Sequence, residues 1–93
     1  GQRRAAIESL ARALRLGLRD QISEVMARYQ LWRSLHAEGR AAEAARELRA
    51  LRRRRAVLRA WGAELADARQ RRHTPNLQQE DALWREIESA LHH

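Results

Sequence analysis

Large apolar side chains recur every three or four residues along most of this 93-residue chain. In the N-terminal part they form one series that ends in two aromatic residues: Ile7, Leu10, Leu14, Leu18, Ile22, Val25, Tyr29 and Trp32. This spacing lines one face of an α-helix, whereas a half-buried strand would show strict alternation of apolar and polar residues. We therefore predict an all-α fold.

The first predicted helix spans about residues 3–37, because no proline interrupts the series. Between Leu14 and Ile22 two successive apolar steps are four residues long, which departs from a heptad and would locally unwind a supercoil. Gly17 lies in this stretch. We interpret it as a weak position that the helix tolerates, at about 1 kcal/mol relative to alanine, with a close helix contact as the alternative.

A turn is predicted at residues 38–40, because Gly39 can adopt the left-handed conformation that ends a helix. A second helix follows over about residues 41–72. Its apolar seam repeats at intervals of seven residues: Ala44, Leu51, Leu58 and Leu65. Because this is the spacing of a buried coiled-coil position, we predict that these three leucines are buried.

The only proline, Pro75, marks a second turn at residues 73–76, with Thr74 capping a third helix over about residues 76–91. The first two helices and their turn carry a positive net charge and residues 73–93 carry −3, which favours packing of the third helix on the hairpin. The prediction is a single helical domain over residues 1–93. It consists of a long antiparallel hairpin plus a short C-terminal helix, packed like a coiled coil or a three-helix bundle.

The chain has nineteen arginines and no lysine, a bias that GC-rich coding explains as readily as a binding surface does. Four arginines are consecutive and form a possible anion-binding site: Arg52, Arg53, Arg54 and Arg55. Such a run could bind phosphates, so a basic helical nucleic-acid-binding module is one alternative function. However, the four side chains span a full helical turn, acidic residues lie on the same helix, and no aromatic residues are interleaved with them.

A second alternative is a calmodulin-type regulated segment. Leu48, Val57 and Trp61 occupy the first, tenth and fourteenth places of a basic amphipathic stretch. That spacing resembles one class of calmodulin target. Leucine-rich helices also produce it by chance.

The sequence offers little for catalysis. It has no cysteine, and its serines, histidines and carboxylates form no recognisable constellation. Glu80 and Asp81 would point about 100° apart on a helix, and His36 and His73 lie near predicted helix ends, where imidazole more often caps carbonyls than binds metal. We expect no enzyme activity, cofactor, metal or small-molecule substrate. The absence of an eighteen-residue apolar run predicts no membrane partner, and the lack of cysteine fits an intracellular location, cytoplasmic or nuclear.

A non-enzymatic assembly or adaptor subunit is the function that the pattern favours. Two helices of more than thirty residues would each run about 50 Å and the third only about 25 Å, so the turn end of the first helix would stay uncovered. Tryptophan and arginine are enriched where proteins bind one another. The predicted partner-binding residues are Val25, Met26, Tyr29, Trp32, Leu51, Leu58, Trp61 and Leu65. The expected partner is a helical protein or a second copy of the chain.

Overall fold

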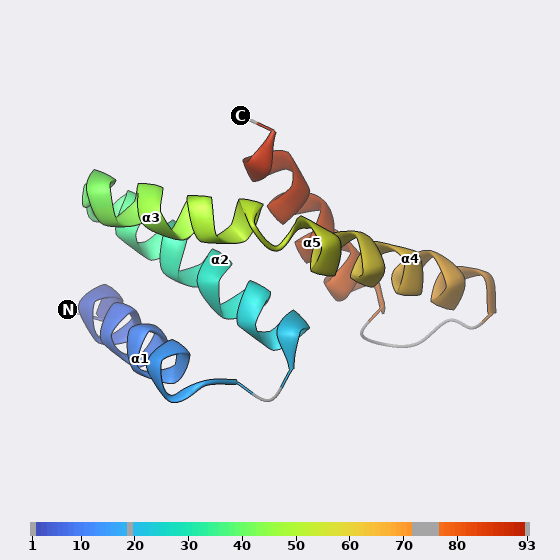
Figure 1. The fold of residues 1–93 in the computed structure, drawn as a ribbon, viewed down its shortest axis with the longest axis horizontal. Helices are drawn as coiled ribbons and strands as arrows, with labels where there is room; N and C mark the ends of the chain where they lie inside the picture. Colours follow the sequence, from blue (N-terminus) through green and yellow to red (C-terminus); the bar gives the residue numbers. More distant parts are fainter. Residues whose placement is uncertain (1, 19, 72–76, 93) are drawn as a thin grey trace.

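A computed structural model describes residues 2–18, 20–71 and 77–92. In these ranges the chain is all-helical and contains no strand, as predicted. Five helices follow one another along the sequence: α1 (Gln2–Leu16), α2 (Gln21–Ala37), α3 (Ala41–Arg52), α4 (Arg55–Arg71) and α5 (Leu77–Leu91). The hairpin of α2 and α3 lies in the middle, with α1 beside α2, and with α4 and α5 extending from the far end of α3 (Figure 1).

The predicted continuous helix over residues 3–37 is wrong, because the chain reverses direction between α1 and α2 (Figure 1). Gly17 has a φ of +86°, in the left-handed region that side chains rarely adopt, and it follows directly after the last residue of α1. Asp20 then caps α2, since its carboxylate accepts hydrogen bonds from the backbone N–H of Ser23 at 2.7 Å and from the Ser23 hydroxyl at 2.9 Å. Gly17, which we interpreted as a weak position that the helix tolerates, therefore ends α1, and Asp20 begins α2.

The turn between α2 and α3 lies at residues 38–40, where it was predicted. Gly39 has a φ of +74°, and its backbone N–H donates to the carbonyl of His36 at 3.1 Å. The N–H of Arg40 donates to the carbonyl of Leu35 at 2.9 Å. These two bonds form a Schellman motif, which satisfies carbonyls that the helix end would otherwise leave open.

The predicted continuous helix over residues 41–72 is also wrong, because a turn at Arg53 and Arg54 separates α3 from α4. No glycine or proline causes this break. Arg54 N–H donates to the carbonyl of Leu51 at 2.9 Å instead of to the carbonyl of Ala50 four residues back. The Arg54 guanidinium, through Nη1, donates to the Ala50 carbonyl at 3.1 Å. The side chain thus replaces the helical bond that its own backbone no longer makes.

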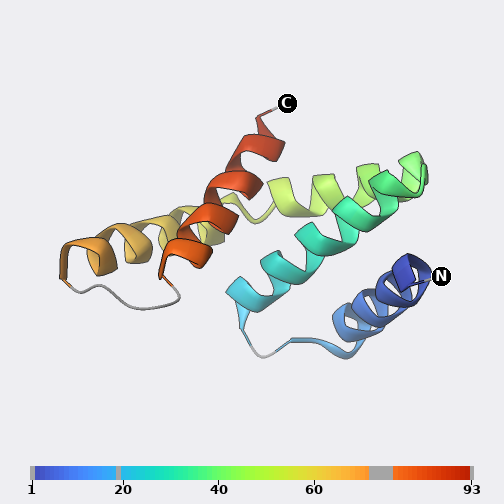
Figure 2. The ribbon, with the colours of Figure 1, turned by 180° about the vertical axis from the view of Figure 1, so that it is seen from behind.

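The fifth helix begins and ends close to the predicted bounds of 76–91, whereas the predicted turn at 73–76 lies outside the described residues. From behind, α5 runs back along α4 towards the junction with α3 (Figure 2). Trp84 of α5 fits against Gly62 of α4, and its indole Nε1 donates to the carbonyl of Leu58 at 2.7 Å. A Cβ atom at position 62 would lie 2.5 Å from Cζ2 of Trp84, so this approach requires glycine.

Two hydrophobic clusters stabilise the fold. The larger one joins α2, α3, α4 and α5 through its buried residues: Val25, Tyr29, Leu51, Leu58, Trp61, Leu65, Leu77, Ile87 and Leu91. The smaller one joins α1 to the hairpin through Ile7, Leu31, Leu35 and Ala44. Trp32 is partly buried and packs against both clusters.

The breaks make the molecule shorter than the predicted hairpin. Its greatest extent is 41 Å, whereas an unbroken helix of more than thirty residues would run about 50 Å. None of the described helices is long and apolar enough to span a bilayer. The arrangement is therefore a hairpin of two shorter helices, α2 and α3, flanked by α1 and by α4 with α5.

Candidate functional site

The predicted partner-binding residues lie inside the chain's own core. Six of them are buried: Val25, Tyr29, Leu51, Leu58, Trp61 and Leu65. Met26 and Trp32 are partly buried against the same cluster. Burial of Leu51, Leu58 and Leu65 confirms the interpretation of the heptad seam. The expectation of an uncovered stripe around Val25, Tyr29 and Trp32 is wrong, because the bend between α3 and α4 lets α5 reach the larger cluster.

The four consecutive arginines do not form one surface. Arg54 is partly buried and faces α2, whereas Arg52, Arg53 and Arg55 are exposed. Arg53 lines a surface hollow beside Gly17 and Leu18. The possible anion-binding site thus lies on a turn, and Arg54 is engaged within the chain.

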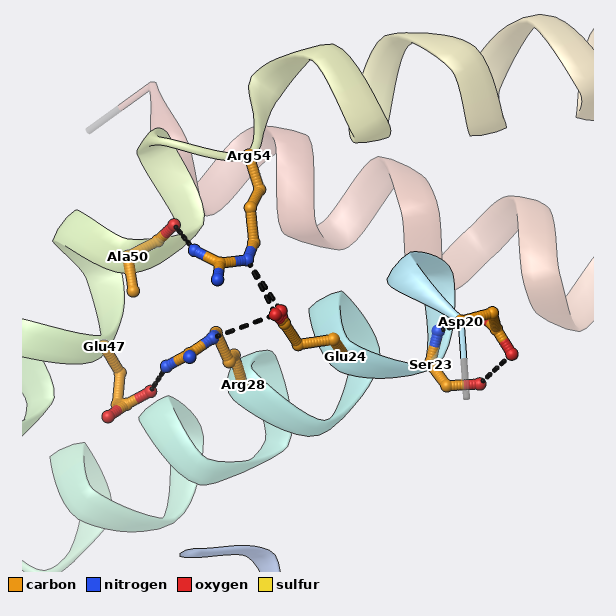
Figure 3. A network of polar contacts seen from close by, with 7 residues as sticks. All are labelled: Asp20, Ser23, Glu24, Arg28, Glu47, Ala50 and Arg54. Carbon is orange, nitrogen blue, oxygen red and sulfur yellow. Dashed lines mark hydrogen bonds and ion pairs between the residues drawn. The ribbon is translucent and has the colours of Figure 1, made fainter. Parts of the chain in front are cut away.

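Arg54 belongs to a polar network that ties the bend to α2 (Figure 3). Its Nε lies 2.9 and 3.0 Å from the two carboxylate oxygens of Glu24. Glu24 also attracts Arg28, one turn further along α2, at 4.0 Å. Arg28 Nη1 in turn donates to Glu47 of α3 at 3.0 Å. Two arginines and two glutamates therefore link α2, α3 and the turn in one chain of charges.

The network is partly shielded from water, and its charges stabilise one another. The pKa of Glu24 is lowered, chiefly by the hydrogen bond from Arg54; burial opposes this shift, and the charges of Arg54 and Arg28 add to it. The Nε atom of Arg28 is buried and has no hydrogen-bond partner within the described ranges. Its ion pair with Glu24 at 4.0 Å is therefore its compensation for lost hydration.

A groove of about 550 Å³ lies between α1 and α3, with α2 as its floor. The walls and floor contain these residues: Arg4, Ile7, Glu8, Ala11, Arg12, Arg15, Leu31, Leu35, Arg40, Glu43, Arg46 and Glu47. α1 and α3 both pack on α2 and make little contact with each other. At the other end of the molecule α5 covers α4 and the end of α3, whereas no helix of the described chain covers this groove.

Positive charges outnumber negative charges in the lining of the groove. Arg40 pairs with Glu43, through Nη2 at 2.7 Å and Nε at 2.8 Å, and Glu47 pairs with Arg28. The pKa of Glu43 is lowered, chiefly by the hydrogen bond from Arg40, and the charges of Arg40 and Arg46 act in the same direction. Within the described ranges, four arginines of the groove form no ion pair: Arg4, Arg12, Arg15 and Arg46. The groove therefore has an excess of unpaired positive charge.

A second hollow, of about 530 Å³, continues beyond the end of α1. Leu14, Gly17 and Leu18 form one side, and Arg53 and Val57 form the other. Leu16, which precedes Gly17 in the chain, is 81% exposed and Leu18 is 37% exposed, which makes them the large apolar side chains most open to solvent in the described part. Apolar surface and arginine thus occur together at this second hollow.

No group of three or more histidine, cysteine, aspartate or glutamate side chains in the described ranges could hold a metal ion. The imidazole of His36 stacks on Trp32 with ring centroids 5.4 Å apart, and His92 lies 3.6 Å from Glu88. His73 lies outside the described residues. Asp81 forms ion pairs with Arg69 of α4 and with Arg85 of its own helix, each at 3.0 Å. It therefore helps to hold α5 against α4.

Sequence reasoning missed the groove and the polar network. The spacing of Glu24 and Arg28, four residues apart, does indicate a pair on one helix face. Nothing in the linear pattern, however, brings Glu47 or Arg54 to that face. One face of α1 is indicated by the helical spacing of its charged residues Arg4, Glu8, Arg12 and Arg15. Only the reversal of the chain after Gly17 turns this face towards α3.

Comparison of the chain with protein-family models, with curated proteins and with solved structures finds no match.

Proposed function

We propose that this chain is a non-enzymatic helical interaction module, an assembly or adaptor subunit that binds a helix of another protein in the groove between α1 and α3. The observation that carries the proposal is the incomplete packing around α2. Two helices flank it at this end, and the space between them is open above Leu31 and Leu35, which are already buried in the smaller cluster. Helical bundles complete such a three-helix layer with a fourth helix.

The groove is long enough for part of one helix. Its lining runs from Arg4 to Arg15 on α1, about 16 Å of helix, and from Arg40 to Glu47 on the α3 side, about 10 Å, so it can accompany about two to three turns of a partner. Ala11 is a partly exposed apolar residue of the α1 wall, whereas Ile7 is buried, and charged side chains make up most of the lining. The attraction of this groove for a partner is therefore chiefly electrostatic.

The calmodulin alternative receives less support. It needs one continuous helix from Leu48 to Trp61, whereas the turn at Arg53 and Arg54 interrupts this stretch. Trp61, which would be an anchor, is only 3% exposed. The nucleic-acid alternative is disfavoured by the glutamates in the groove and by the burial of Tyr29 and Trp61 in the core, where they cannot stack on bases.

Site-specific photocrosslinking tests the proposal. A photoreactive amino acid replaces Ala11 on the α1 wall in one variant and Glu43 on the α3 wall in another, within cells that make the full chain. The matched control carries it at Ala63, which is exposed on α4 and lies outside the groove. We expect both groove variants to crosslink to a helical segment of one and the same partner protein, which mass spectrometry identifies. The control should not form this adduct.

Two results would contradict the proposed function. Adducts only with nucleic acid would favour the basic-module alternative. Equal yields of the same adduct from position 63 and from the groove would show that the groove is not the binding surface.

A further inference from the structure

We infer that the helix taken up by the groove between α1 and α3 is acidic, with negative side chains on both of the flanks that face the groove walls. This inference rests on the proposed function and adds the chemistry of the partner. It follows from which charges in the groove are already neutralised and which are not.

After the internal ion pairs are accounted for, positive charge is in excess on both walls of the groove. On the α3 wall Arg40 is paired with Glu43 and Glu47 is paired with Arg28, so Arg46 remains. On the α1 wall Glu8 stands among Arg4, Arg12 and Arg15, none of which has an ion-pair partner in the described chain. A helix lying between these walls meets positive charge on either side, so carboxylates on both flanks would be stabilised.

The spacing of these arginines matches the spacing of side chains on a helix. Arg4 and Arg12 are eight residues apart on α1, which corresponds to about 12 Å along the axis. Arg12 and Arg15 are separated by about 4.5 Å of rise. Glutamates three or eight residues apart on a helix parallel or antiparallel to α1 have the same separations along the axis.

A protein helix fits these charges better than a phosphate backbone does. Glu8, Glu43 and Glu47 stand among the arginines, and they would repel a continuous polyanion while leaving room for discrete carboxylates. A second copy's own acidic helix is not the occupant, because its apolar side chains Leu77, Ile87 and Leu91 are already buried in its own core.

The test uses two synthetic peptides of sixteen residues with the same leucine stripe. One has glutamate and the other glutamine at the positions that flank the stripe, and both carry the same fluorophore. Binding to the full chain is measured by fluorescence anisotropy at 50 and 200 mM salt. We expect the glutamate peptide to bind at least tenfold more tightly at 50 mM salt, with a smaller ratio at 200 mM because salt screens exposed charges.

Charge reversal locates the effect. Arg12→Glu combined with Arg46→Glu changes one residue on each wall, and we expect it to weaken the glutamate peptide at least tenfold and to leave the glutamine peptide within about twofold. The matched control combines Arg55→Glu with Arg59→Glu, two exposed residues outside the groove, with the same change in net charge. Circular dichroism verifies that both variants keep their helices.

Each other outcome overturns a specific statement. Equal affinity for the two peptides refutes the acidic partner and leaves the proposed function standing, whereas binding of neither peptide overturns both. An equal loss in the matched control refutes the groove as the location. A single-stranded RNA of twenty nucleotides that binds more tightly than the glutamate peptide, and loses affinity on reversal of Arg12 and Arg46, would replace the protein partner with a nucleic acid.

Discussion

Replacing Gly62 with alanine should destabilise this protein, although the same change stabilises most exposed helix positions. Gly62 lies in the interior of α4, directly under the indole of Trp84. The added Cβ atom would lie 2.5 Å from Cζ2 and 2.7 Å from Cε2 of Trp84, distances that real Cβ contacts essentially never show. The indole cannot simply move aside, because its Nε1 donates to the carbonyl of Leu58 at 2.7 Å.

The opposing effects can be compared directly. Alanine in place of glycine improves helix propensity by about 1 kcal/mol. Relieving the contact requires α5 or the ring to shift by about 1 Å, and overpacking of this kind costs roughly 1–3 kcal/mol. Such a shift also stretches the hydrogen bond to Leu58, whose loss costs about 1 kcal/mol. We therefore expect Gly62→Ala to lower the free energy of unfolding by about 1–3 kcal/mol.

Urea denaturation followed by circular dichroism measures this change, with Ala63→Gly as the matched control. Ala63 is the next residue of α4 and is exposed, so glycine there should cost about 1 kcal/mol through propensity alone. In a Trp84→Leu background the clash is absent, and Gly62→Ala should then stabilise by about 1 kcal/mol. This change of sign isolates the coupling between positions 62 and 84.

A stabilising effect of Gly62→Ala in the parent chain would refute the reasoning, because it would show that the indole of Trp84 does not rest on α4. The same effect in both backgrounds would also refute it.

Three further predictions concern the core, the first loop and the polar network. Leu58→Ala should lower the free energy of unfolding by about 2–5 kcal/mol, because Leu58 is 0% exposed, whereas Leu16→Ala, at an 81% exposed position, should change it by less than about 0.5 kcal/mol; equal effects in urea denaturation would contradict the assignment of the core. Gly17→Ala should cost about 1–2 kcal/mol, because φ is +86° there, and a stabilising effect would instead indicate that α1 and α2 form one continuous helix. The pKa of Glu24 is lowered in the folded chain, so its contribution to stability is complete above the ordinary value of 4.5 and is lost as the pH falls through the lower folded value. Glu24→Gln should flatten that part of the pH dependence in denaturation experiments between pH 5 and about 2, and an unchanged profile would show that Arg54 does not bind Glu24.

Local rules explain the parts of the fold that the sequence predicted. The helical periodicity of the leucines, the Schellman turn around Gly39 and the C-terminal helix depend on interactions between residues no more than seven positions apart. Burial of Leu51, Leu58 and Leu65 follows from the same spacing. Gly17 and Asp20 also carry a local signal, a helix stop followed by an N-cap, although the apolar series continues past them with helical spacing.

Tertiary structure decided the rest. Arginine is common inside helices, so Arg53 and Arg54 give no sign of a break. In the turn, the guanidinium of Arg54 donates hydrogen bonds to Glu24 of a different helix and to the carbonyl of Ala50. The approach of Trp84 to Gly62 and the open groove beside α2 likewise join segments far apart in the chain. The sequence by itself determined that the chain is helical and that Leu51, Leu58 and Leu65 are buried, because periodicity is a local property. The positions where the long helices break, and therefore which faces remain open, depend on contacts that exist only after the chain has folded.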